Sequence, residues 1–228
     1  MKMLVIIPAY NEQDSILTTI KDIKENAPAF DYVVINDCST DDTLKICRDN
    51  GVKVLDLPIN LGIGGAVQTG YLYAMKHDYD VAVQFDGDGQ HDAKFLQNMA
   101  NVLIENNADM VIGSRFIDNK GFQSSGIRRI GIRFFAFLTK VFFGKKITDA
   151  TSGMRMCNRK VIELFVQDYP RDYPEPESVC RLLHEKCKVI EVPVVMRERT
   201  AGVSSISMKK SVYYMIKVSL AIFFERLR

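Results

Sequence analysis

The sequence lacks the features of secreted and membrane-spanning proteins. No uninterrupted apolar run reaches the roughly 18 residues of a spanning helix. The apolar stretch at the N-terminus is short and ends at Pro8 without the small-residue cleavage pattern of a signal peptide. The five cysteines form no Cys-x-x-Cys pair, and an odd number in a chain of 228 residues does not suit a disulfide scaffold. These absences predict a reduced, cytoplasmic setting.

Internal repeats, low-complexity tracts and interdomain linkers are also missing. The chain is 47% hydrophobic and 25% charged, which suits one folded domain with a sizeable core. Its formal net charge of +2 favours no class of partner by itself. A basic patch can indicate nucleic acid, but no recognition motif accompanies the cations, so we expect no nucleic-acid partner.

Short apolar runs alternate with helical spacings of apolar residues through the first half of the chain. The expected strands lie at residues 3–7, 32–35, 52–57, 81–85 and 110–114, and the expected helices at 15–26, 40–50, 60–77 and 92–106. Later elements are expected as a short strand from residue 155, helices at 159–167 and 177–185, and a strand at 189–193. This alternation predicts an α/β fold with a mostly parallel central sheet flanked by helices.

Two segments of the C-terminal half combine bulky apolar residues with lysines and arginines. They are residues 126–143 and residues 211–224. Interfacial helices have this composition, with an apolar side in the lipid boundary and cations near anionic headgroups. We therefore expect amphipathic basic helices at a membrane surface, and core helices with a solvated basic edge are the alternative.

The chain is organised around an acidic turn after the fourth strand, Asp86-Gly87-Asp88-Gly89. Side chains two apart on an extended backbone point to the same side, so Asp86 and Asp88 can present their carboxylates together. Two close carboxylates repel each other unless a cation lies between them, and oxygen ligands favour Mg²⁺ or Mn²⁺. A polar turn that merely ends a core strand is the alternative.

Polar loops also follow the other strands that we expect to be parallel, and the carboxyl ends of parallel strands share one edge of the sheet. Tyr10 can lie against a nucleobase, and Glu12 or Asp37 can accept a hydrogen bond from a base or a ribose. Arg115 can make a bidentate contact with a phosphate. Each residue alone has another explanation as a cap or a surface charge, but together they predict a site for a nucleoside diphosphate.

These residues resemble the inverting family 2 glycosyltransferases of the GT-A fold. The resemblance is to the branch with dolichyl-phosphate mannose synthase and the bacterial polyprenyl-phosphate and cell-envelope glycosyltransferases. The matching motifs follow the expected order across roughly residues 3 to 206. They are Ile7-Pro8-Ala9-Tyr10-Asn11-Glu12, Asn36-Asp37-Cys38-Ser39-Thr40-Asp41, Asn60-Leu61-Gly62-Ile63-Gly64-Gly65-Ala66, Asp86-Gly87-Asp88-Gly89-Gln90-His91, Gly113-Ser114-Arg115 and Thr151-Ser152-Gly153.

The resemblance implies a GT-A domain, a nucleotide-sugar donor, a divalent cation (Mg²⁺ or Mn²⁺) and inversion at the anomeric carbon. We expect this domain at residues 1–206 and an amphipathic helix at residues 207–228. The positions that resemble the nucleotide-sugar contacts are Pro8, Tyr10, Glu12, Asp37, Asp86, Arg115 and Arg199. The positions that resemble the metal site are Asp86, Asp88 and Gln90.

The acceptor stays open at this point. A lipid phosphate is already ionised and needs no general base. A sugar hydroxyl needs a carboxylate to take its proton, and Glu175 and Glu177 are the candidates. Both can instead simply favour a helix N-terminus. In either case Arg115 and the cation are expected to stabilise the charge that grows on the leaving diphosphate.

The sequence thus predicts a metal-dependent inverting glycosyltransferase that uses a UDP- or GDP-linked sugar. The predicted acceptor is a polyprenyl phosphate or a hydroxyl of a lipid-linked or cell-envelope glycan. The predicted location is the inner face of the membrane, as a peripheral protein. One alternative is a haloacid-dehalogenase-like phosphohydrolase, whose Asp-x-Asp-Gly motif normally follows the first strand. The other is a non-catalytic protein that binds sugar nucleotides.

Overall fold

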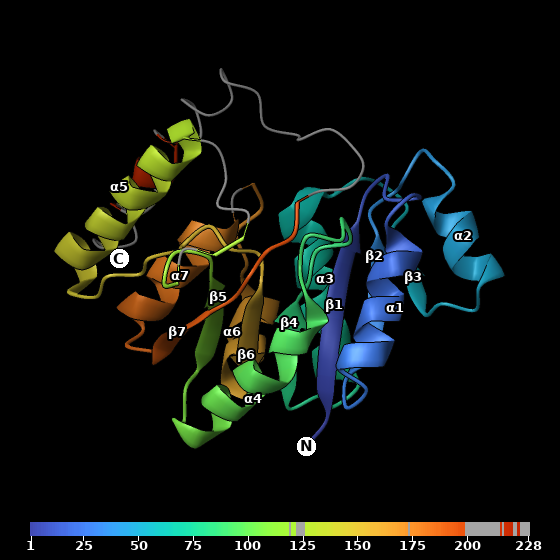
Figure 1. The fold of residues 1–228 in the computed structure, drawn as a ribbon, viewed down its shortest axis with the longest axis horizontal. Helices are drawn as coiled ribbons and strands as arrows, with labels where there is room; N and C mark the ends of the chain where they lie inside the picture. Colours follow the sequence, from blue (N-terminus) through green and yellow to red (C-terminus); the bar gives the residue numbers. More distant parts are fainter. Residues whose placement is uncertain are drawn as a thin grey trace.

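Seven strands among the described residues form one central sheet, in the order β3-β2-β1-β4-β6-β5-β7 (Figure 1). The structure is a computed structural model and describes residues 1–118, 120–121, 126–172, 174–198, 215, 217–220 and 223. The strands are β1 (Met3–Ala9), β2 (Asp31–Asn36), β3 (Val54–Asp56), β4 (Val81–Gln84), β5 (Met110–Ser114), β6 (Arg155–Asn158) and β7 (Val189–Pro193). Neighbouring strands are parallel except where β6 pairs with β4 and β5. The predicted mostly parallel sheet is confirmed.

Helices cover both faces of this sheet. They are α1 (Ile16–Asn26), α2 (Thr43–Asp49), α3 (Gly62–Lys76), the short 3₁₀ helix η1 (Ala93–Phe95), α4 (Leu96–Glu105), α5 (Gly126–Phe143), α6 (Arg159–Gln167) and α7 (Pro174–His184). Buried residues of α1, α2 and α4 form one hydrophobic core with the sheet. Buried residues of α3, α6 and α7 form the other. The predicted α/β class with flanking helices is therefore confirmed.

The central strand β1 shows why a continuous apolar run is needed here. Successive side chains of a strand point to opposite faces. Val5 and Ile7 accordingly pack in the core with α1, whereas Leu4 and Ile6 pack in the core with α3. Because both faces are covered, a polar residue at either set of positions would lose its contact with water.

Several element boundaries differ by a few residues from the sequence prediction, and for α7 and β3 the reason is local. Helix α7 begins at Pro174 rather than at Glu177. Proline suits the first turn of a helix, because its fixed φ is compatible with the helix and the missing N–H would have no partner within the helix. Strand β3 spans Val54–Asp56 rather than residues 52–57, because it pairs with β2 over three residues at the sheet edge.

Helix α5 packs on α7 rather than on the sheet. Phe135 of α5, Cys180 of α7 and Val218 of the C-terminal segment form a small separate hydrophobic cluster. Residues 215, 217–220 and 223 are helical, but the rest of the C-terminal helix predicted at 207–228 lies outside the described residues. The division at residue 206 therefore stays a prediction. Among the described helices, none has the length and apolar character needed to cross a bilayer.

Candidate active site

The carboxyl ends of β1, β2 and β4 meet at one sheet edge, as the parallel pairing predicts. Hydrogen bonds tie their loops together. The Asp37 N–H donates to the Ala9 carbonyl at 2.9 Å, and the Asn11 N–H donates to Ser39 Oγ at 3.0 Å. Ser15 Oγ at the start of α1 donates to the Gly87 carbonyl at 2.8 Å. The loops expected to form one site are thus held in one network.

The predicted nucleoside contacts lie on this edge with different exposures. Pro8 is buried in β1, Glu12 is partly exposed and Tyr10 is 47% exposed, so the Tyr10 ring is accessible to a ligand. Asp37 is buried and accepts a 2.7 Å hydrogen bond from the Leu61 N–H. Burial raises the pKa of Asp37, and the Leu61 and Gly62 N–H groups offset only part of that rise. Their roles toward a nucleoside stay predictions.

Asp86, the first acid of the turn, is held on both carboxylate oxygens. Gln84 Nε2 donates to Oδ1 at 3.2 Å, and His91 Nε2 lies 3.2 Å from Oδ2. A Cβ added to Gly153 would lie 2.5 Å from Oδ2, so this glycine lets the segment from β5 to β6 close against the carboxylate. Burial raises the pKa of Asp86, but His91, the Gln84 hydrogen bond and the charge of Arg155 together outweigh it and hold the pKa below its usual value.

Asp88, the second acid, is partly exposed and accepts a hydrogen bond from the Gln90 N–H at 3.0 Å. Between them Gly89 has φ +76°, a left-handed conformation that glycine adopts without strain, and a Cβ there would meet no atom within 4 Å. The turn is therefore open on the Asp88 side, while on its Asp86 side Gly153 packs against a carboxylate whose side chain is 34% exposed.

The donor chemistry of this turn fits a hard divalent cation. The described residues contain no group of three or more His, Cys, Asp or Glu side chains arranged to hold a metal. Mg²⁺ commonly binds through one or two carboxylates and completes its shell with substrate phosphates and water. An Asp88-centred site with Asp86 behind it suits that mode of binding, because the ion would need oxygens from a bound diphosphate.

Arg155 on β6 holds together the chain segments around residues 150–152 and 175–178, and it was not among the site residues predicted from the sequence. Its side chain is fully buried. The guanidinium donates to the carbonyls of Ala150 and Ser152, each at 2.6 Å, to Ser178 Oγ at 2.9 Å and to the Glu175 carbonyl. The segment after α5 and the start of α7 are thereby fixed to the strand beside β4.

This clamp brings Glu175, one of the two predicted bases, next to the acidic turn. Gln84, which donates to Asp86, and the charge of Asp86 both shift the pKa of the Glu175 carboxyl, so the amide and the two acids lie close together. Burial and the charge of Asp86 raise the pKa of Glu175, although Arg155 opposes the shift. Glu177 lies roughly 200° further around α7, at 3.6 residues per turn. The catalytic roles of Glu175 and Glu177 stay predictions.

Arg115, the predicted phosphate ligand, is engaged by a carboxylate. Its Nη2 and Nε donate to the two oxygens of Asp149, each at 2.7 Å, and Nη2 also contacts Thr151 Oγ1 at 3.0 Å. Asp149 is fully buried. This bidentate ion pair anchors the segment after α5 to the end of β5. The phosphate contact of Arg115 stays a prediction, which requires the guanidinium to serve both partners.

Gln90 and Arg197 join the acidic turn to the chain after β7. The Arg197 N–H donates to the Gln90 carbonyl at 2.8 Å, and Gln90 Nε2 donates back to the Arg197 carbonyl at 3.4 Å. The Arg197 guanidinium pairs with Asp22 and Asp92, both buried. Metal binding by Gln90 stays a prediction. Arg199, the other predicted phosphate ligand, lies outside the described residues.

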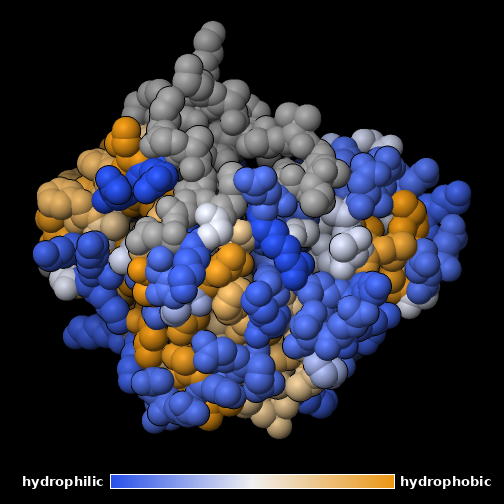
Figure 2. Space-filling model, in the orientation of Figure 1, coloured by the Kyte–Doolittle hydropathy of each residue, from blue (hydrophilic) through white to orange (hydrophobic). Residues whose placement is uncertain are grey.

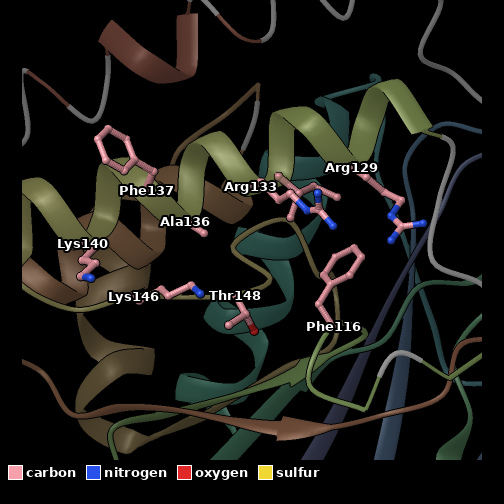
Figure 3. Close-up of a pocket in the computed structure, with 9 residues that line it drawn as sticks. Phe116, Arg129, Arg133, Ala136, Phe137, Lys140, Lys146 and Thr148 are labelled. Carbon is pink, nitrogen blue, oxygen red and sulfur yellow. The ribbon is translucent and has the colours of Figure 1, made fainter.

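A basic cavity of about 520 Å³ lies between α5 and the end of β5 (Figure 3). Figure 3 shows Arg129, Arg133 and Lys140 extending from α5 toward the side where Phe116 and Thr148 lie. The cavity, called here the basic pocket, is lined by Phe116, Arg129, Ile132, Arg133, Ala136, Phe137, Lys140, Lys146 and Thr148. These side chains combine cations with apolar groups and include no acid.

The segment 148–153 connects the basic pocket to the acidic turn. Thr148 lines the pocket, Asp149 holds Arg115, and Gly153 packs on the Asp86 carboxylate. One short stretch of chain thus touches both sites. The arrangement can hold an acidic, cation-dependent ligand on one side and an anionic ligand with an apolar part on the other.

The sequence from residue 4 to residue 165 matches the family model for glycosyl transferase family 2. The chain belongs to this family. As a family 2 member it is a glycosyltransferase, which confirms the predicted enzyme class and gives no support to the phosphohydrolase or the non-catalytic binder.

Two relatives of this family 2 chain are named for a lipid phosphate, each with a different sugar. This chain is 29% identical over 216 residues to the undecaprenyl-phosphate mannosyltransferase of Micrococcus luteus, and the alignment covers 91% of this chain and 88% of the relative. It is 28% identical over 210 residues to the UDP-N-acetylglucosamine–dolichyl-phosphate N-acetylglucosaminyltransferase of Methanococcus voltae, with 83% of each chain covered.

The fold also matches the glucosyl-3-phosphoglycerate synthase of Mycobacterium tuberculosis, crystallised with Mn²⁺, UDP and phosphoglyceric acid. The TM-score is 0.73 at 16% identity, with 99% of this chain and 78% of that chain covered. This likeness confirms the predicted GT-A fold of the family 2 chain.

Proposed function

We propose that this glycosyltransferase transfers a sugar from a nucleoside diphosphate to a polyprenyl phosphate. The observation that carries the proposal is the basic pocket, which joins cations to apolar side chains one short segment away from the acidic turn. A polyprenyl phosphate has the matching composition, an anionic head on an apolar chain. The relatives from Micrococcus luteus and Methanococcus voltae are named for acceptors of this class, which supports the same choice.

The donor is proposed to bind at the edge formed by β1, β2 and β4. Tyr10 would stack on the base, and Asp37 and Glu12 would accept hydrogen bonds from the nucleoside. Asp88, with Asp86 behind it, would hold a divalent cation, Mg²⁺ or Mn²⁺. When bound, such a cation neutralises the charge of the diphosphate. The glucosyl-3-phosphoglycerate synthase structure contains Mn²⁺ with UDP, which is consistent with this assignment.

The groups around Asp86 would contribute to catalysis by holding its carboxylate in a fixed orientation. Gln84 and His91 hold its carboxylate, and the segment at Gly153 packs so closely on it that an added Cβ would clash. A turn held in this way needs little rearrangement when the charged leaving group forms, which is the usual source of large electrostatic rate effects. The acceptor phosphate would lie in the basic pocket, where Arg133 and Lys140 can neutralise its charge.

A phosphate acceptor brings its own ionised nucleophile, so the proposal assigns Glu175 no proton transfer. Glu175→Gln should then lower kcat by less than about tenfold, because the amide keeps the shape of the side chain and no proton transfer is lost. A general base for a sugar hydroxyl would cost about 10²–10⁴-fold. Glu177→Gln is the matched control in the same helix turn. A loss of that size in Glu175→Gln alone would support the hydroxyl acceptor, for which the position of Glu175 beside Asp86 is the favouring observation.

The proposal includes a location, the cytoplasmic face of the membrane that carries the acceptor. Nucleotide sugars and reduced cysteines suit the cytoplasmic side, and a polyprenyl phosphate is confined to the bilayer. A glycan hydroxyl on the same membrane would place the chain at the same face, so the location does not depend on which acceptor is used.

The direct test incubates the purified protein with UDP-, GDP- and TDP-sugars, Mn²⁺ and polyprenyl phosphate in detergent. We expect one donor class to release its nucleoside diphosphate and to form a sugar-linked lipid that is stable to organic extraction. Omission of the polyprenyl phosphate should abolish sugar transfer. Transfer to a soluble glycan but not to the lipid phosphate would overturn the proposed acceptor.

A further inference from the structure

The outer surface of α5 carries an apolar stripe that the described residues leave open to solvent. Its members recur at the 4-3-4 spacing of one helix face, and each is a large exposed hydrophobic residue. They are Ile130 (69% exposed), Phe134 (39%), Phe137 (60%) and Val141 (57%). Soluble proteins rarely expose contiguous apolar surface of this kind unless it contacts a partner.

The cations of α5 lie directly beside this outer stripe. Arg129, Arg133 and Lys140 each precede a stripe residue by one position, which places them about 100° around the helix axis. Residues 126–148 contain no Asp or Glu, so this segment contributes charge of only one sign to the surface beside the stripe. Figure 2 shows hydrophobic and strongly hydrophilic residues next to each other over α5, at the upper left of the molecule.

The opposite side of α5 is already used for packing. Phe135 is fully buried against Cys180 of α7 and Val218 of the C-terminal segment, and Phe142 contacts Phe223 edge-on. None of the four stripe residues belongs to the hydrophobic cluster that holds α5 to α7. The helix stays in place through its inner side and keeps the apolar stripe and the cations available together.

We infer that the outer stripe of α5 docks on an anionic phospholipid bilayer, with Ile130, Phe134, Phe137 and Val141 in the interfacial region. The flanking cations fix the choice of partner, because they complement anionic headgroups while the apolar side chains enter the acyl boundary. Phe137 belongs to both the stripe and the wall of the basic pocket. Docking in this orientation would bring the pocket to the lipid surface, so a lipid phosphate could reach the cations while its chain remains in the bilayer.

The inference deepens the proposed function, and it is tested without turnover. The full chain is mixed with vesicles of phosphatidylcholine alone, or of phosphatidylcholine with phosphatidylglycerol, and no polyprenyl phosphate is added. We expect sedimentation with the anionic vesicles, weak sedimentation with the neutral ones, and release as salt screens the headgroups. Equal binding to both vesicles, or binding to neither, would overturn the inference.

The double substitution Ile130→Ser and Val141→Ser tests the stripe without touching the pocket wall. We expect affinity for anionic vesicles to fall about tenfold or more, because two buried apolar side chains are lost from the contact. The matched control is Leu72→Ser with Ile104→Ser, two exposed apolar residues on α3 and α4 (45% and 49% exposed). The control should bind like the wild type, and equal losses in both variants would overturn the assignment to α5.

Two further readouts separate this inference from the proposed function. Transfer to detergent-dispersed polyprenyl phosphate should persist in the Ile130→Ser, Val141→Ser variant, while transfer to vesicle-embedded acceptor should fall. Loss of vesicle binding with no loss of transfer to the embedded acceptor would overturn the docking but not the glycosyltransferase. Analytical ultracentrifugation tests whether the outer stripe instead binds a second copy of the chain. A wild-type dimer that the same variant converts to a monomer would show that the stripe binds a second copy.

Discussion

In the acidic turn, Asp86 is held on both carboxylate oxygens and Gly153 packs against it, whereas in the basic pocket Arg133, Lys140 and Lys146 are exposed. The first region is built from hydrogen bonds between loops that are far apart in the sequence. The second is built mainly from one amphipathic helix and its surface charges. A fixed acidic site suits a ligand of defined geometry, and a pliable basic surface suits a long, flexible one.

The largest effect is expected from Asp88→Ala. If the open side of the acidic turn holds the cation and the diphosphate, kcat should fall about 10²–10³-fold. The melting temperature, measured in parallel, separates a loss of the site from a loss of the fold. Release of nucleoside diphosphate measures the rate. A variant with near-wild-type kcat would remove Asp88 from the site and make the acidic turn purely structural.

Gly153→Ala tests whether the packed side of the turn matters as much as the open side. The added Cβ would meet Asp86 Oδ2 at 2.5 Å, so the carboxylate or its backing segment must move. Misplacement of a reacting group by an ångström can cost about 10²-fold, and we expect a fall of roughly 10- to 10²-fold in kcat/KM.

The control for Gly153→Ala is the same substitution in an Asp86→Ala background. Because the clashing carboxylate is absent there, the added methyl should cost little, and the two substitutions should be strongly non-additive. Additive losses would show that Gly153→Ala acts elsewhere, for instance through the fold, and would separate Gly153 from the acidic turn.

The double substitution Arg133→Gln and Lys140→Gln tests whether the basic pocket binds the acceptor phosphate. We expect the KM for detergent-dispersed polyprenyl phosphate to rise about tenfold or more, since charge-assisted contacts with the phosphate are lost. The KM for the nucleotide sugar should stay unchanged. Lys21→Gln with Lys76→Gln removes the same charge from α1 and α3 and should leave both KM values unchanged. A rise in the donor KM instead would place the pocket cations on the donor side.

The smallest expected effect is on the stability of the fold and comes from Asp37, in the loop after β2. Burial raises the pKa of Asp37 above its ordinary value of 3.8, so the folded state binds this proton more tightly than the unfolded state. The ionised carboxylate therefore destabilises the fold above the folded-state pKa, and that penalty disappears as the pH falls through it.

Asp37→Asn should accordingly raise the melting temperature slightly at neutral pH, and the gain should shrink as the pH falls toward about 4. The Leu61 N–H can still donate to the amide oxygen. Donor affinity should fall at the same time, because the carboxylate is the proposed acceptor for the nucleoside. A pH-independent change in melting temperature would contradict the first part, and unchanged donor affinity would contradict the second.

The fold could be predicted from the sequence where local signals dominate. The bounds of β5, α5, α6 and β7 match the expected residues 110–114, 126–143, 159–167 and 189–193. The insertion of β6 between β4 and β5 in the antiparallel sense was not predictable, because it depends on pairing between Gln84 and Arg155 across the sheet. Nothing in the local sequence around either residue indicates that partner.

In the candidate site, too, local motifs could be predicted from the sequence and long-range contacts could not. The acidic turn and the loops after β1 and β2 were predicted from motifs, and parallel pairing brings them together. The contacts of Arg155 with α7 and the ion pair between Arg115 and Asp149 were missed, because each joins residues that lie 20 or more positions apart. An arginine in a short predicted strand that must be buried was the one signal that could have drawn attention to Arg155.

The central claim is that a cation on the acidic turn binds the diphosphate of the donor. Calorimetric titration of UDP and of GDP, with Mn²⁺ and with chelator, tests it most directly on the wild type and on Asp88→Ala. The account predicts that Mn²⁺ tightens binding of one diphosphate at least about tenfold in the wild type and has little effect in the variant. Equal affinity with Mn²⁺ and with chelator in the wild type would contradict it.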